Sequence, residues 1–215
     1  MRLELPFDIL LPVSATILVA GMGGGFDVFC GLPIYFELRQ RGYTVYLANL
    51  SFSALKEYSD GEWLSATLVG VGAADVELSG YYPERFLARW FRESQGEEVP
   101  LWCFDAAGAV ALLEDYRRLV QRLQIDAIIL VDGGVDSPAR GDEELCGTIL
   151  EDYLSIAAVS QLQEVPVSDR SLRIRSDPAV SEQRARFTRQ CVTTSARIRF
   201  LLGTLSLRIY GVIYR

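Results

Sequence analysis

The chain has 215 residues, of which 50 % are apolar and 23 % are charged, as in a globular protein large enough to bury a core. It contains no histidine, which excludes a Ser-His-Asp or Cys-His nucleophile and any histidine-ligated metal. Lys56 is the only lysine, and no Gly-Lys-Ser/Thr sequence occurs, so a P-loop is excluded as well.

The net charge of −7 is unevenly distributed along the chain. Residues 1–166 contain 25 acidic and 11 basic residues, whereas residues 167–215 contain 3 acidic and 10 basic residues. The acidic part argues against a nucleic acid or an anionic membrane as partner. The basic end either binds an anion or packs against the acidic part.

Strand and helix patterns alternate from the first apolar run onward. A β-rich run at 16–20 predicts a strand that ends in glycines. Pro33 and Gly42 then bracket a predicted helix at 34–41, and a second strand at 44–47 follows it.

A third strand is predicted at 67–71 and a helix at 83–91, after Tyr82. The apolar residues of this helix are expected to share one side, and they are Phe86, Leu87, Trp90 and Phe91.

The clearest helical period runs over 109–123, between predicted strands at 101–104 and 127–131. One more helix is predicted at 148–159. Repeated β-α units of this kind predict an α/β fold with a doubly wound, mostly parallel sheet, that is, a Rossmann-like three-layer arrangement.

The charge and the apolar pattern of the sequence change after the last of these predicted helices. We expect an α/β domain over 1–166 and a basic, partly irregular extension over 167–215 that adds one or two strands. Within the extension, 168–195 shows no apolar period, 200–207 is apolar again, and 209–214 fits a strand.

Two loops rich in glycine and aspartate follow predicted strands, at 20–27 and 131–136. Ligands of open α/β sheets bind at the carboxyl ends of the strands, where glycines present unshielded amides. The first loop fails the G-x-G-x-x-G dinucleotide fingerprint because Phe26 stands where glycine is needed. Asn49 also replaces the acid expected to hold a ribose.

The two loops nevertheless predict a site for a small anionic ligand. Its expected ligand-binding residues are the loop glycines, one polar residue and one cation, namely Gly23, Gly24, Gly25, Gly133, Gly134, Asn49 and Arg140. A tight turn that holds no ligand is the alternative.

Asp27, Asp132 and Asp136 are expected to meet at the same edge of the sheet. Neighbouring carboxylates repel each other unless a cation lies among them. The three aspartates are therefore candidate ligands of Mg²⁺ or Mn²⁺, or else catalytic acids and bases, with Arg140 balancing their charge.

The four cysteines show no CxxC spacing, and they are Cys30, Cys103, Cys146 and Cys191. Unpaired cysteines of this kind are typical of buried thiols in a reducing cytoplasm, which is the predicted location. No apolar run is long enough for a transmembrane helix.

Several of these segments together resemble an uncharacterised prokaryotic family, the domain of unknown function 1152. The resemblance spans 16–166 and is carried by residues 23–28, 82–84, 126–136, 140–143 and 147–152. The sequence departs from the family pattern beyond 166. The resemblance implies an α/β fold and no established activity.

Three functions remain open from the sequence. The first is a cytoplasmic, metal-assisted enzyme acting on a small anionic ligand that is phosphorylated or nucleotide-like. The others are a non-catalytic module that binds a metabolite or acts as a scaffold, and a degenerate family member. A homo-oligomer is compatible with all three.

Overall fold

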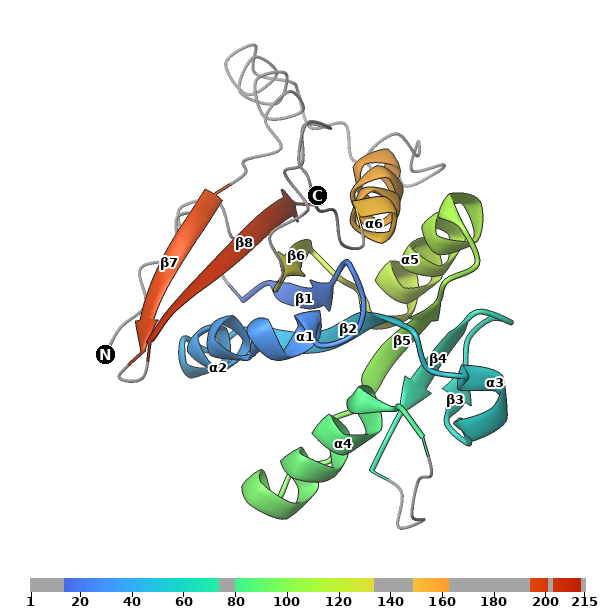
Figure 1. Ribbon diagram of the computed structural model, residues 1–215, viewed down its shortest axis with the longest axis horizontal. Helices are drawn as coiled ribbons and strands as arrows, with labels where there is room; N and C mark the ends of the chain where they lie inside the picture. The colour runs from blue at the N-terminus through green and yellow to red at the C-terminus, as the bar shows by residue number, and fades with distance from the viewer. Residues whose placement is uncertain (1–13, 74–79, 134–148, 163–193, 201–202, 214–215) are drawn as a thin grey trace.

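The computed structural model describes residues 14–73, 80–133, 149–162, 194–200 and 203–213. These residues form one eight-stranded sheet with helices on both faces (Figure 1). The predicted α/β fold and its three layers are therefore confirmed. In the described part of the chain, no helix has the length and apolarity required to cross a membrane.

Four parallel strands form the centre of the sheet, in the spatial order β5-β2-β1-β6. Their bounds are β1 Thr16–Gly21, β2 Thr44–Ser51, β5 Leu101–Asp105 and β6 Ala127–Asp132. Each is an almost continuous apolar run, as expected of strands buried on both faces.

Antiparallel strands extend the sheet at both edges. Beyond β5 lie β4 (Leu68–Val71) and the two-residue β3 (Glu62–Trp63). Beyond β6 lie β8 (Gly203–Ile213) and β7 (Thr194–Phe200), so the end of the chain joins the same sheet. The division into two domains remains a prediction.

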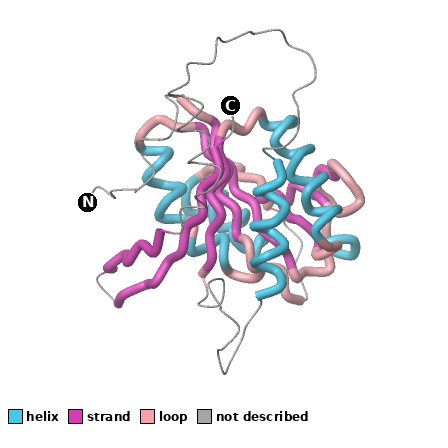
Figure 2. The backbone as a smooth tube through the Cα atoms, turned by 90° about the horizontal axis from the view of Figure 1, so that it is seen from above, coloured by secondary structure: helices cyan, strands magenta, loops and turns pink. Residues whose placement is uncertain are grey.

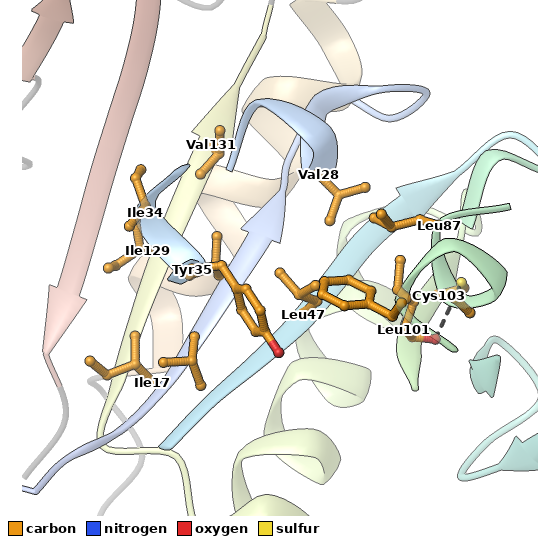
Figure 3. Close-up of a cluster of buried hydrophobic side chains, with 14 of the residues drawn as sticks. Ile17, Val28, Ile34, Tyr35, Leu47, Leu87, Leu101, Cys103, Ile129 and Val131 are labelled. Carbon is orange, nitrogen blue, oxygen red and sulfur yellow. Dashed lines mark hydrogen bonds between the residues drawn. The ribbon is translucent and has the colours of Figure 1, made fainter. Parts of the chain in front are cut away.

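One face of the sheet is covered by α1 (Asp27–Cys30), α2 (Leu32–Gln40), α4 (Pro83–Trp90) and the π-helical turn η2 (Phe91–Gln95). Figure 3 shows this side of the core, where side chains of α2 and α4 pack on residues of β1, β5 and β6. The short α3 (Leu55–Tyr58) follows β2.

The opposite face is covered by α5 (Ala109–Leu123) and α6 (Ile149–Gln161). Figure 2 shows the helices on either side of the twisted sheet. α5 contributes buried Leu112, Tyr116 and Leu119, and α6 contributes Ala158 and Val159.

The predicted third strand is present as β4, but its direction departs from the parallel pattern and the predicted apolar side of the following helix is wrong. β4 is antiparallel to β5, because it belongs to a hairpin with β3 rather than to a β-α-β unit. In α4, Leu87 is buried whereas Phe86 and Trp90 are exposed. The buried face instead includes polar Glu84, which has partners inside the protein.

The order of the central strands defines where the connections change direction. The chain passes from β1 to β2 and then to β5 on one side, and it crosses back to β6 on the other side of β1. The carboxyl ends of β1 and β6 therefore lie side by side at a topological switch point. Open α/β sheets bind their ligands at such a point.

Candidate metal and ligand site

The loop after β1 and the end of β6 meet at the switch point. The Met22 amide donates a hydrogen bond to the Val131 carbonyl over 3.0 Å, which ties the first loop to the last strand of the parallel centre. Met22 is itself fully buried, so the loop is anchored before its glycines begin.

Asp27 opens α1, and its carboxylate accepts hydrogen bonds from both loops. The Gly23 amide donates to Oδ2 over 2.7 Å, and the Gly133 amide donates to Oδ1 over 3.1 Å. Such charge-assisted bonds orient the carboxylate firmly. They also correct the predicted role of Gly23 and Gly133, because these amides bind Asp27 rather than a ligand.

Asp132 and Asp152 stand beside Asp27. Asp132 ends β6, Asp152 lies in the first turn of α6, and both are buried. One carboxylate oxygen of each of the three residues lies within 4.8 Å of the others. Two oxygens on opposite sides of a Mg²⁺ or Ca²⁺ ion are separated by about 4–5 Å, so the spacing suits an oxygen-ligated divalent cation.

The N-terminal half of α6 packs directly on the glycine loop. The Ser155 hydroxyl donates to the Met22 carbonyl over 2.7 Å in a buried position. At Gly23 a Cβ atom would lie 2.0 Å from Asp152 Oδ1 and 2.9 Å from Asp27 Oδ2. Glycine is thus required at this position for the carboxylates to approach each other.

Cys30 lies at the end of α1, next to the same carboxylates. Burial raises the pKa of its thiol, and the charges of Asp27 and Asp132 raise that pKa further. A thiol with a raised pKa is a poor nucleophile at neutral pH.

The glycine loop turns through Gly24 and Gly25, which have φ angles of +93° and +60°. These left-handed conformations favour glycine. Within the described residues, the backbone amides of Gly24 and Gly25 donate no hydrogen bond. Both amides can therefore donate to an anionic group, and their ligand-binding role stays a prediction.

Asn49 stabilises the glycine turn through a hydrogen bond to Gly25. Its Nδ2 donates to the Gly25 carbonyl over 3.0 Å and to Glu84 Oε1 over 2.7 Å, and its side chain is fully buried. Ser53 donates to the other oxygen of Glu84. Because both of its donor positions are used inside the protein, Asn49 supports the loop and has no amide hydrogen left to donate to a ligand, which corrects its predicted role.

The structure thus brings together Asp27 and Asp132 and places Asp152 beside them. Asp136, Gly134 and Arg140 lie outside the described residues, and their roles stay predictions. Asp152 was not assigned to the site by the sequence reasoning. Two signals pointed to it: its position in the first turn of a predicted helix after the second loop, and its place in the segment 147–152 that carries the family resemblance.

Comparison of the chain with protein-family models, with curated proteins and with solved structures found no match. The resemblance to the domain of unknown function 1152 therefore stays a prediction. The class of the protein is given by its fold alone, an α/β sheet with a carboxylate cluster at its switch point.

Proposed function

We propose that this protein binds a divalent cation, Mg²⁺ or Mn²⁺, through Asp27, Asp132 and Asp152, and uses it to hold a small phosphorylated ligand. The observation that carries the proposal is the approach of three carboxylate oxygens within 4.8 Å of one another at the switch point. Three like charges so close, two of them buried, are stabilised by a cation.

The chemistry of the donor set favours a hard cation. All three side chains offer oxygen, which suits Mg²⁺ and Mn²⁺ rather than a thiolate-binding metal. Such an ion neutralises phosphate charge and, in an enzyme, activates bound water. The Gly24 and Gly25 amides lie one and two residues beyond Gly23, close enough to contact the same ligand.

The proposal is tested by thermal unfolding in the presence of metal. Millimolar Mn²⁺ or Mg²⁺ is expected to raise the melting temperature by several degrees, because a cation that binds only the folded state stabilises it by mass action. Asp132→Asn removes one of three carboxylates and is expected to abolish this increase.

The matched control is Asp105→Asn. Asp105 also ends a parallel strand at the same edge, but it lies in β5 and pairs with Lys56 over 3.6 Å. This variant is expected to keep the full response to metal. An absent response in the parent protein, or an equal loss in both variants, would contradict the metal site.

A turnover measurement distinguishes the hypothesis of an enzyme from that of a metabolite-binding module. Incubation of a stabilising phosphorylated compound with the metal-loaded protein distinguishes them, because an enzyme converts the compound and a binding module returns it unchanged. The carboxylate cluster suits both, and the oriented Asp27 favours the enzyme because catalysis requires fixed groups.

A further inference from the structure

Three exposed aromatic side chains surround the glycine turn. Phe26 is 59 % exposed, and Phe52 and Tyr81 are each 46 % exposed. They come from three separate segments, the start of α1, the loop after β2 and the residues before α4. Single exposed apolar side chains are common, but several that gather around one loop form a patch of the kind that marks a binding surface.

The contacts place all three rings on the same turn. The Phe52 ring lies so near Gly24 that a Cβ there would be 2.6 Å from it, and the Tyr81 hydroxyl would lie 3.1 Å from a Cβ at Gly25. The rings of Phe26 and Tyr81 are 6.0 Å apart and nearly perpendicular. The two glycines thus leave room for these rings.

The aromatic residues also adjoin the carboxylate cluster. Gly23 touches the cluster, and Phe26 lies three residues further on, which separates their Cα atoms by at most about 11 Å.

We propose that Phe26, Phe52 and Tyr81 bind the base of a nucleoside phosphate whose phosphates lie on the metal-loaded carboxylates. This inference rests on the proposed function and names its ligand class. Aromatic side chains stack on any of the nucleic acid bases, because every base has a π-face. The amides of Gly24 and Gly25 lie between the two halves of the site and suit the phosphate nearest the ribose.

The test is calorimetric titration in Mg²⁺ with ADP, GDP, CDP and UDP, and with pyrophosphate as the probe that lacks a base. At least one nucleoside diphosphate is expected to bind tenfold or more tightly than pyrophosphate. Phe52→Ala and Phe26→Ala are each expected to weaken that nucleotide about tenfold and to leave pyrophosphate binding unchanged.

Trp90→Ala is the matched control, since Trp90 is 39 % exposed but lies at the far end of α4, about 10 Å along the helix from Pro83. It is expected to bind nucleotide like the parent. All three residues are partly exposed, so truncation leaves the core intact, as melting curves will check.

The possible failures point to different conclusions. If pyrophosphate binds and no nucleotide binds more tightly, the base site is wrong and the metal-phosphate site stands. If neither pyrophosphate nor any nucleotide binds, the phosphorylated ligand of the proposed function is wrong as well. If Trp90→Ala weakens nucleotide binding as much as Phe52→Ala, the stacking surface has been misplaced.

Discussion

Glu84 is a fully buried carboxyl group in the first turn of α4, held by Asn49 and Ser53. Burial raises its pKa above the ordinary value of 4.5, and the hydrogen bond from Asn49 opposes part of this shift. A raised pKa means that the folded state favours the protonated form. The contribution of Glu84 to stability is therefore full below pH 4.5 and is lost as the pH rises through the raised pKa.

Glu84→Gln removes this titration and keeps an acceptor for Asn49. The free energy of unfolding of the parent, relative to the variant, is expected to be highest near pH 4 and to fall as the pH rises. Urea unfolding of both proteins between pH 4 and 8 measures the difference. The exposed Glu93→Gln serves as the control and should show no such trend; a flat difference for Glu84→Gln would contradict the argument.

The contact between Asn49 and Glu84 shows why the roles of site residues are harder to predict than helices and strands. Asn49 was expected to contact a ligand because it stands where dinucleotide-binding folds carry an acid. The sequence could not reveal that Glu84, 35 positions later, would lie beside it and use its amide. Asp152 escaped prediction for the same reason, since its approach to Asp27 depends on how α6 packs over the loop after β1.

At the scale of elements, local patterns were sufficient where a segment is a continuous apolar run or has a clear helical period. β1, β5 and β6 are continuous apolar runs, and α5 begins and ends at the predicted residues. β3 has only two residues and no pattern of its own, so the hairpin that makes β4 antiparallel could not be foreseen. A strand's partner is determined by tertiary pairing, which periodicity does not report.

The packing of α6 on the glycine loop, through the hydrogen bond from Ser155, can be tested separately. Ser155→Ala removes the buried hydrogen bond to the Met22 carbonyl and leaves that acceptor without its donor. We expect the free energy of unfolding to fall by about 1–2 kcal/mol. We also expect Mn²⁺ to bind several-fold more weakly, because Asp152 lies one turn earlier on the same helix.

The control for this change is Ser160→Ala. Ser160 is exposed on α6, and its hydroxyl bonds only within the helix, to the Ala157 carbonyl. Chemical unfolding and metal titration of both variants separate the two positions. Equal effects on metal affinity would mean that α6 does not position the site through Ser155.

At the scale of the whole molecule, the candidate site exists only because the strand order reverses. Gly23, Asp132 and Asp152 are far apart in the sequence, and the crossing from β5 to β6 brings their segments to one edge. A cation held there would connect three parts of the chain that otherwise meet through a few hydrogen bonds. Opening any one of them would break the metal site.

This coupling predicts a particular pattern of hydrogen exchange. Saturating Mg²⁺ is expected to slow exchange together in the loop after β1, at Gly133 and in the first turn of α6, because local opening there costs the binding free energy. The β3–β4 hairpin lies across the sheet from this site, beyond β2 and β5, and should exchange at its metal-free rate through local opening.

Exchange followed by mass spectrometry, with Asp132→Asn as the control without metal response, measures all of these segments at once. Protection confined to the first loop would show that Asp27 binds the ion without Asp132 and Asp152, and protection of the hairpin to the same degree would show that the ion acts elsewhere.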